Sequence, residues 1–339
     1  CYQQALALEP SHASAQFNQA YVYLRRGDYA RGWAALEARD WYAALARQLP
    51  WPRWQGEALA GRALLIGLEA GLGDMIQFCR YAAQLKALGA RRVGVLCHPP
   101  LAALFARLEG VDAVYALGSE IDEDWDVWSP PLSLPHHCHT QLDSIPAALP
   151  YLHAEPARMA AWAPRLPPRE AGWRVGLVWK GNPKFENDAE RSLPSLAALA
   201  PLAALPGVQW ISLQKGAGQA EARAANAPLP LWPLGEDFAD LADTAAVLRQ
   251  LDLVISVDTA VAHLAGALAV PCWVLLPAYQ TDWRWLAGRE DSPWYPGCLR
   301  LFRQPTRGDW ATPIQRVAQA LAAWGDGRAP GLNPICTTP

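Results

Sequence analysis

From residue 62 onward, short apolar runs alternate with helix-like segments, and this alternation limits the possible folds more than any other feature of the chain. The first series predicts a strand at 62–69, a helix at 75–90, a strand at 91–99, a helix at 100–111, and short strands at 113–117 and 125–133. Strands that alternate with helices predict a parallel sheet with right-handed crossover connections.

A second series of the same kind begins near Trp173. It predicts strands at 173–182, 208–216, 252–258 and 271–277, and helices at 192–205, 243–251, 259–268 and 313–324. Four prolines in the stretch between the two series predict a linker near 153–172. The interpretation is therefore two Rossmann-like α/β domains, at 52–155 and 172–326, followed by a flexible tail at 327–339.

Residues 1–48 have a helical period instead, with a break at Gly27–Asp28. The residues that carry a repeat-like pattern are Ala15, Asn18, Ala20, Leu24, Gly27, Asp28, Tyr29 and Ala30. This segment resembles tetratricopeptide repeats, with an ordinary helical hairpin as the alternative. Because the sequence starts at Cys1 in mid-pattern and without Met, we expect it to be truncated: either further repeats came first, or these helices pack on the domain that follows.

Composition excludes several classes of protein. Hydrophobic residues make up 52% of the 339 residues and charged residues 18%, so a large core is expected and disorder is not. The net charge of −3 and the lack of a basic block argue against a nucleic-acid partner. Seven scattered cysteines without a CxxC motif predict reduced thiols in a cytoplasmic protein. No apolar run is long enough for an integral membrane span.

The stretch "SVDTAVAH" (256–263) predicts an anion site. It reads as a strand that ends at Asp258–Thr259 and feeds a helix starting with small residues such as Ala260. Small side chains let a ligand approach the free N–H groups of the first turn, where the helix dipole favours negative charge. His263 lies one turn further on. The structural alternative is that Asp258 or Thr259 simply caps the helix.

A second motif, "LEAGLGD" (68–74), stands at the corresponding strand end of the first series. Gly71 and Gly73 let the backbone approach a ligand, and Glu69 and Asp74 add two carboxylates. A hydroxyl nucleophile is weak at neutral pH and benefits from a general base. The alternative is that Asp74 is an N-capping residue after a glycine turn.

Two further segments of the second series carry polar residues at strand ends. Lys180, Asn182 and Arg191 lie in "WKGNPKFENDAER" (179–191), and a cation there could neutralise a departing diphosphate. Gln214 in "SLQKG" (212–216) could reach a nucleotide. The alternative for both is a solvated polar loop. "PHHCH" (135–139) lacks a second ligand cluster, so no metal site is expected. The Trp-rich stretch at 281–296 is interpreted as core, and no residue in it as catalytic.

The pattern D-T-x-x-x-H-L-A-x-A-L-x-x-P, from Asp258 to Pro271, resembles the signature of glycosyltransferase family 9, the heptosyltransferases. The resemblance covers nearly the whole chain and implies the GT-B architecture, with this turn binding the diphosphate of a nucleotide-sugar. It implies that the loop containing Glu69, Gly71 and Gly73 faces the acceptor, with Asp74 as the general base, and that Arg191 is the basic loop residue. The chain departs from the family at Ala260, where glycine is usual, and at Ala70, where glutamine is expected.

Tetratricopeptide repeats joined to a family 9-like domain resemble bacterial glycosyltransferases, some linked to flagellin. The resemblance implies an inverting, metal-independent enzyme with a nucleotide-sugar co-substrate, no further cofactor, and a protein acceptor presented by the repeats. Three alternatives remain: a lipopolysaccharide heptosyltransferase, a non-catalytic repeat scaffold with a decayed transferase domain, and another nucleotide-sugar enzyme such as an epimerase. The sugar, its nucleotide and the oligomeric state are not predicted.

Overall fold

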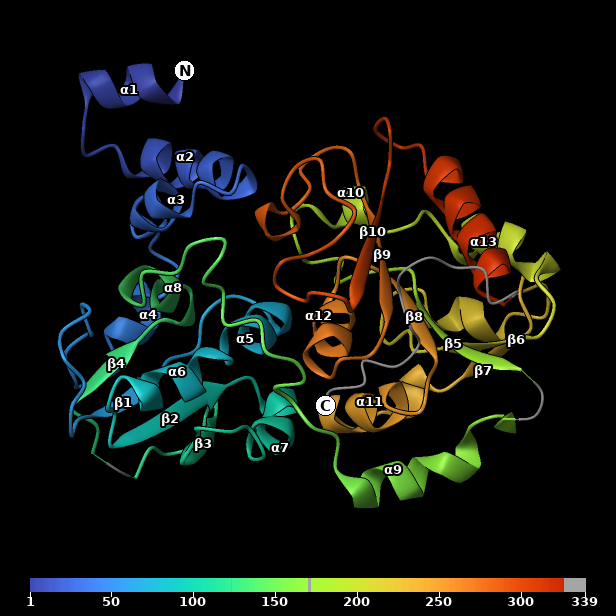
Figure 1. Cartoon of the computed structure of the whole chain (residues 1–339), viewed down its shortest axis with the longest axis horizontal. Coiled ribbons are helices and arrows are strands. Elements are labelled where there is room, and N and C mark those ends of the chain that lie inside the picture. The colour runs from blue at the N-terminus through green and yellow to red at the C-terminus, as the bar shows by residue number, and fades with distance from the viewer. Residues whose placement is uncertain (123, 170–171, 326–339) are drawn as a thin grey trace. The chain divides into compact units, whose positions relative to one another are not determined.

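A computed structural model describes residues 1–122, 124–169 and 172–325, which form two compact units (Figure 1). The first unit consists of Cys1–Leu152 together with Asp282–Arg289. The second consists of His153–Thr281 and the chain from Glu290 onward. The predicted tail at 327–339 lies outside the described residues.

The first unit begins with four helices: α1 (Tyr2–Leu8), α2 (Ala13–Arg25), α3 (Tyr29–Leu36) and α4 (Ala43–Ala46). The predicted break lies between α2 and α3, where Gly27 has a left-handed backbone (φ +79°). Asp28 then caps α3 by accepting a hydrogen bond from the Arg31 N–H (3.4 Å). A Cβ atom on Gly32 would lie 2.5 Å from the Leu24 side chain, so glycine permits the close packing of α2 on α3.

The first sheet has four parallel strands in the order β3-β2-β1-β4. These are β1 (Ala63–Ile66), β2 (Arg92–Cys97), β3 (Ala113–Ala116) and β4 (Val127–Ser129), and the helical elements between and after them are α5 (Leu72–Phe78), α6 (Tyr81–Ala87), η1 (Pro99–Leu101), α7 (Ala102–Phe105), η2 (Pro131–Ser133) and α8 (Leu134–His137). The single helix predicted at 75–90 is wrong in detail, because the chain forms two helices there. The "PHHCH" stretch begins within α8.

The helical start of the chain also covers one face of this sheet. Leu45 and Tyr42 pack against a buried cluster of the sheet that includes Leu65 and Trp128. A Cβ atom on Gly67 would lie 2.9 Å from the Trp128 ring and 3.0 Å from Leu45. The chain that leaves β1 therefore passes close to both of these side chains. The helices and the first sheet therefore share a core.

The second sheet has six parallel strands in the order β10-β9-β8-β5-β6-β7. The strands are β5 (Trp173–Val178), β6 (Val208–Ser212), β7 (Leu231–Pro233), β8 (Leu253–Val257), β9 (Cys272–Leu276) and β10 (Leu299–Arg303). Two of them, β7 and β10, were not expected from the sequence. Both are edge strands, and each pairs with one neighbour only.

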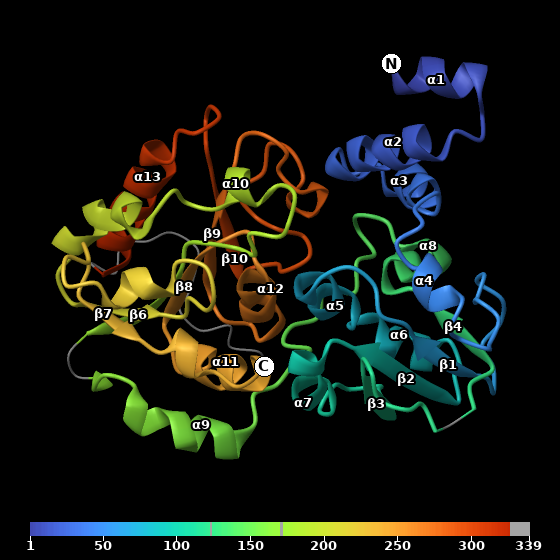
Figure 2. The ribbon, with the colours of Figure 1, turned by 180° about the vertical axis from the view of Figure 1, so that it is seen from behind.

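Helices cover both faces of the second sheet, which makes it doubly wound. The helical elements of this unit are α9 (Pro156–Trp162), η3 (Ala163–Arg165), α10 (Asp188–Arg191), η5 (Leu196–Ala204), η6 (Gln219–Arg223), η7 (Gly235–Asp237), α11 (Leu241–Leu248), α12 (Ala260–Ala267) and α13 (Ala311–Gly325). Leucines of η5 and apolar residues of α13 join one core cluster with alternate residues of β5 and β8. Figures 1 and 2 both show α11 and α12 as neighbours, and α12 packs on β8 and β9.

Two sequence-based expectations for this unit differ from the structure in detail. The predicted linker at 153–172 contains α9, which packs on α11. The helix predicted at 192–205 is the 3-10 helix η5, which has Pro201 in its interior. Proline has no N–H group and clashes with an α-helical turn before it, so a regular α-helix is not formed there.

The described ranges contain no helix whose length and apolarity would let it cross a membrane.

Candidate functional site

The second sheet changes its winding direction between β5 and β8. β5 lies in the centre, β6 and β7 follow on one side, and β8, β9 and β10 follow on the other. In open α/β sheets, ligands bind outside the carboxyl ends of the strands at such a switch point. Lys180 and Asn182 follow β5, and Asp258 and Thr259 follow β8, so the topology brings two of the predicted motifs to one place.

The start of α12 has free hydrogen-bond donors. Thr259 is its N-cap residue, but the Thr259 hydroxyl pairs with the Ser256 hydroxyl (3.0 Å) and makes no capping hydrogen bond to the helix. The neighbouring α11 differs, because the Asp240 carboxylate accepts from the N–H groups of Ala242 (2.9 Å) and Asp243 (3.0 Å).

Residues 258–261 are also half-exposed, whereas the strand before them and the helix after them are buried. A ligand can therefore reach the first turn of α12. Uncapped N–H groups and the positive end of the helix dipole together suit an anion there.

His263 is buried inside this turn. Its Nδ1 atom lies 2.8 Å from the Tyr295 hydroxyl, and its Nε2 atom lies 4.0 Å from an Asp258 carboxylate oxygen. A Cβ atom on Gly266 would come within 2.4 Å of the Tyr295 ring, so only glycine allows this approach. Tyr295 and Asp258 together fix the imidazole ring. The His263 residue is 6% exposed, which leaves little of its surface for direct contact with a ligand.

Gln214 joins the loops that follow β5 and β6. Its side-chain oxygen accepts from the N–H groups of Trp179 (2.9 Å) and Lys180 (3.0 Å). Its side-chain nitrogen donates to the carbonyl oxygens of Lys180 (3.0 Å) and Ala217 (2.8 Å). The amide group is therefore committed to the backbone. Gln214 therefore holds the chain at the end of β5. The sequence predicts that Gln214 contacts a nucleotide, but its amide group already has these backbone partners.

Arg191 lies close to the end of β5. A Cβ atom on Gly181 would be 2.7 Å from an Arg191 guanidinium nitrogen, so any larger residue there would displace the end of the Arg191 side chain. The guanidinium pairs with Asp188 (3.1 Å) and lies over the Phe185 ring at 4.4 Å. Since Asp188 is only one carboxylate, the guanidinium keeps donors for a further anion.

The other two polar residues of this loop make mainly local contacts. The Lys180 ammonium donates to the Pro194 carbonyl (2.9 Å) and lies 3.7 Å from a Glu221 carboxylate oxygen. The Asn182 side chain accepts from the Lys184 N–H (3.0 Å) and so shapes the turn. Both residues remain at the carboxyl end of β5, as the sequence predicts.

In the first unit, the corresponding switch point lies between β1 and β4. The chain leaving β1 reaches α5 through Ala70, whose backbone is left-handed (φ +58°), and Gly71. Asp74 is in the first turn of α5, and one of its carboxylate oxygens accepts from the Gly71 N–H (2.8 Å). Gly71, not Asp74, is therefore the N-cap residue of α5, and Asp74 occupies the third position of the helix, from which its carboxylate accepts from the N-cap N–H. Gly73 follows Leu72 in the same turn.

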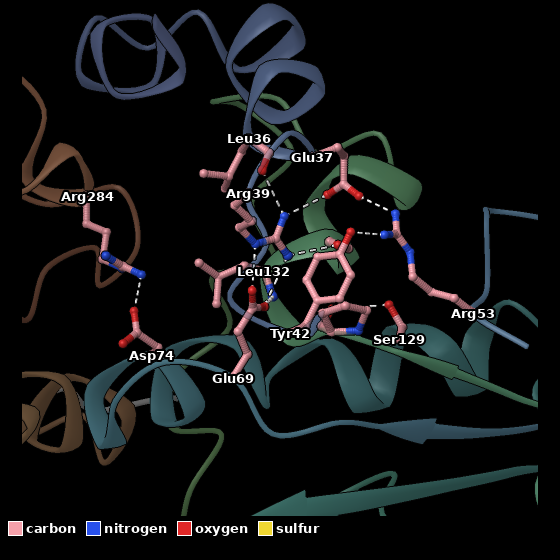
Figure 3. Close-up of polar contacts among 12 residues, drawn as sticks. Leu36, Glu37, Arg39, Tyr42, Arg53, Glu69, Asp74, Ser129, Leu132 and Arg284 are labelled. Atoms are coloured by element: carbon pink, nitrogen blue, oxygen red, sulfur yellow. Dashed lines mark hydrogen bonds and ion pairs between the residues drawn. The ribbon is translucent and has the colours of Figure 1, made fainter. Parts of the chain in front are cut away.

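The second carboxylate of this loop, Glu69, is a structural anchor. It is 1% exposed and pairs with Arg39, which follows α3, at 2.6 Å and 3.1 Å (Figure 3). Arg39 also reaches Glu37, which in turn pairs with Arg53 (2.6 Å). Burial raises the pKa of Glu69, while Arg39 acts in the opposite direction. Because Glu69 is enclosed and paired, we no longer expect it to face an acceptor.

Sequence patterns missed Arg284, which forms an ion pair with Asp74 (Figure 3). Arg284 lies in η8 (Trp283–Trp285), within the Trp-rich stretch that we interpreted as core. Trp283 and Trp285 are indeed buried. The arginine between them is separated from Asp74 by 210 positions, and no local pattern could have linked the two residues.

His136 and His137 of the "PHHCH" stretch lie in α8, with 5.1 Å between their ring centroids. Across the described ranges, no group of three or more His, Cys, Asp or Glu side chains is arranged to hold a metal ion. His137 instead packs edge-on against the Trp54 ring, with 5.3 Å between centroids.

Comparison with known proteins supports both parts of this description. Residues 1–34 match the family model described as a tetratricopeptide repeat. The chain is 32% identical over 332 residues to Protein FlbA of Caulobacter vibrioides, a match that covers 91% of this chain and 55% of that protein. The chain thus spans little more than half the length of this curated relative.

Among solved structures, the chain resembles a glycosyltransferase of family 9 from Veillonella parvula. That match has a TM-score of 0.57 at 11% identity and covers 79% of this chain and 97% of the other. The ADP-heptose lipopolysaccharide heptosyltransferase II of E. coli gives a TM-score of 0.52 at 14% identity, over 77% of this chain and 98% of the other.

The chain therefore joins a tetratricopeptide-repeat segment to a GT-B fold of the family 9, heptosyltransferase-like kind. Protein FlbA is a distant homologue. The fold and the repeat segment that the sequence predicts are confirmed.

Proposed function

We propose that this chain is a glycosyltransferase that moves a sugar from a nucleotide-sugar donor to an acceptor hydroxyl. The observation that carries the proposal is the start of α12. It is uncapped, half-exposed and follows the β8 end of the switch point, where a diphosphate can accept from the N–H groups of Ala260 and Val261. The family has glycine at the position of Ala260. The methyl group of Ala260 narrows the path of a ligand to these N–H groups but does not block it.

The donor we would test first is an ADP-sugar. The E. coli enzyme with the similar fold is named for ADP-heptose. The loop after β5 supports a diphosphate of any nucleoside, because Arg191 retains free donors beside Gly181. Arg191 would neutralise the departing diphosphate, which allows displacement without a metal ion.

In the first unit, we assign Asp74 as the general base that takes the proton from the acceptor hydroxyl. Its side chain is 22% exposed and is held by Gly71 and Arg284. Direct attack by that hydroxyl on the anomeric carbon would invert its configuration. The same loop contains Gly71 and Gly73, which leave room for an acceptor.

The acceptor we favour is a protein, such as a flagellin. The repeat helices belong to the same compact unit as the sheet that precedes Asp74, so a polypeptide bound to the repeats would belong to the acceptor half. A glycolipid acceptor would not require them. The described cysteines are free, which is consistent with the predicted cytoplasmic location.

A thermal-shift screen of ADP-, UDP-, GDP- and CMP-sugars tests the proposal. At 100 times Kd, one of these donors should stabilise the protein by about 2.7 kcal/mol. The variant Thr259→Trp should abolish the shift, because an indole would cover the start of α12.

Ala13→Trp is the matched control, because it places the same bulk at the exposed start of α2. It should retain the shift. No shift with any donor in folded wild-type protein would contradict the transferase proposal and favour a repeat scaffold.

A further inference from the structure

One short segment packs with the first unit although its neighbours in sequence belong to the second. The segment is Asp282–Arg289. The Trp283 ring meets the Trp33 ring of α3 edge to face, with 5.3 Å between centroids. The Ala287 N–H donates to the carbonyl oxygen of Arg25 at the end of α2 (3.0 Å). The segment is thus fixed on the two helices of the repeat.

Arg284 projects from this segment as a buried cation. Its residue is 7% exposed, and its guanidinium lies over the Trp283 ring at 4.4 Å. One terminal nitrogen meets Asp74, and the other donates to both carboxylate oxygens of Asp282 (3.0 Å each). Burial lowers the pKa of Arg284, but Asp282 and Asp74 outweigh it and keep the group charged.

The two contacts of Asp74 hold its carboxylate from two sides. One oxygen accepts from the Gly71 N–H (2.8 Å), and the other accepts from Arg284. A carboxylate offers about four acceptor positions, so room remains for an acceptor hydroxyl. Because Asp282 shares the charge of Arg284, the guanidinium does not neutralise Asp74 alone. The geometry therefore orients the carboxylate and leaves it accessible.

We propose that Arg284 is a positioning residue for Asp74, and that the segment Asp282–Arg289 links the orientation of Asp74 to the repeat helices α2 and α3. This inference rests on the proposed function, because it treats Asp74 as the base. Arg39 gives the same loop a second anchor, since it holds Glu69 (Figure 3). The loop from β1 to α5 is thus held by two arginines that lie outside the sheet.

Hydrogen exchange followed by mass spectrometry tests the inference without any activity. In Arg284→Met, exchange in residues 68–78 should become about tenfold faster or more, because a buried carboxylate contact is lost. Trp283→Leu, which weakens the packing on Trp33, should change the same peptide in the same direction by less.

The matched control is Arg158→Met. Arg158 also pairs with two carboxylates, those of Asp240 (2.8 Å) and Asp243 (2.7 Å), but it lies in the second unit. Its loss should leave exchange in 68–78 unchanged. Unchanged exchange in Arg284→Met would overturn the inference, whether or not the chain is a transferase.

Kinetics then separate positioning from a general structural role. With a functional donor, Arg284→Met should lower kcat by up to about a hundredfold and leave the donor KM unchanged, because only the base is displaced. Arg284→Lys keeps the charge without the planar fork and should recover part of the loss.

A rise in kcat in Arg284→Met would contradict positioning and show that Arg284 masks Asp74. If Asp74→Asn leaves turnover intact, Asp74 is not the base. The exchange experiment does not depend on that result, because it tests only whether Arg284 holds the loop at 68–78. If Arg284→Met does not fold, the variant Arg284→Lys replaces it. Wild-type exchange rates in residues 68–78 of Arg284→Lys, together with a wild-type kcat, would overturn the inference.

Discussion

The helices α5 and α12 each follow a strand at the switch point of their sheet, yet they begin differently. Asp74 in the first turn of α5 reaches back to the Gly71 N–H, so this helix start presents a carboxylate. The first turn of α12 contains only small or apolar side chains before His263, and its N-cap residue, Thr259, makes no capping hydrogen bond. One helix start therefore offers a hydrogen-bond acceptor, and the other offers donors.

This difference indicates how one type of strand–helix turn can serve two tasks. A fixed carboxylate suits the deprotonation of a hydroxyl, whereas uncapped N–H groups suit a diphosphate. The surrounding charges follow the same division. Arg284 holds the carboxylate of the first turn, and Arg191 lies at the end of β5, the strand beside β8.

The largest expected effect comes from Asp74→Asn. Asparagine keeps the size of the side chain but cannot act as a general base, so kcat should fall by about 10² to 10⁴-fold. Donor binding should not change, because the variant leaves the second unit intact. Steady-state kinetics and donor titration measure the two quantities.

Asp28→Asn is the matched control for this variant. Asp28 is also a helix-capping aspartate of the first unit, at the start of α3. Asp28→Asn should retain the wild-type kcat. An equal loss of kcat in both variants would indicate that Asp74 only stabilises the start of its helix.

Removal of the cation beside the end of β5 should have the next largest effect. Arg191→Met is expected to lower kcat by about 10²-fold, because the departing diphosphate loses a charged donor. Lys184→Met removes an exposed cation from the same loop and should have little effect. Similar losses in the two variants would indicate only the general charge of the loop.

A third variant makes α12 resemble the capped helices. In Thr259→Asp, a carboxylate should cap the helix and stabilise the protein by about 0.5–1 kcal/mol. The same carboxylate should repel a diphosphate and weaken nucleotide binding about tenfold, or 1.4 kcal/mol. Urea unfolding and nucleotide titration should therefore change in opposite directions. Stronger nucleotide binding in this variant would argue against an anion at the helix start.

The smallest expected effect concerns the pH dependence of the Arg39 anchor. Burial alone would raise the pKa of Glu37, but Arg39 and Arg53 outweigh it, so the pKa lies below its ordinary value of 4.5. A lowered pKa stabilises the fold above the unfolded value and loses this contribution as pH falls through the folded value.

Glu37→Gln should therefore lose less stability than wild type between pH 7 and the acid range below 4.5. Urea midpoints at the two pH values measure this difference. Glu9→Gln, at an exposed position, should behave like wild type. A steeper loss on acidification in Glu37→Gln would contradict the assignment.

Local patterns predicted most of the fold but not the edge strands of the second sheet. The inner strands of that sheet are nearly continuous apolar runs, such as 272–276, because both faces of the sheet are covered. β7 escaped detection because it has three half-buried or exposed residues and ends at Pro233. β10 was missed because Arg300 and Arg303 give it a polar pattern, which suits an edge strand.

The candidate site was predictable only in part, for a similar reason. Asp74, Thr259 and Arg191 follow strands, and the parallel topology places such residues at the carboxyl edges of the sheets. The buried state of Glu69 depends on Arg39, and the position of Asp74 depends on Arg284, at separations of 30 and 210 residues. Contacts of this range depend on tertiary packing, which sequence periodicity does not encode.

The central claim is that the uncapped start of α12 binds the diphosphate of a nucleotide-sugar. Isothermal titration of ADP into wild type, Thr259→Trp and Asp74→Asn tests it most directly. The account predicts that wild type and Asp74→Asn bind ADP with equal affinity, and that Thr259→Trp binds at least about 100-fold more weakly, a difference of about 2.7 kcal/mol. Equal binding by Thr259→Trp and wild type would contradict the claim and place any nucleotide site elsewhere.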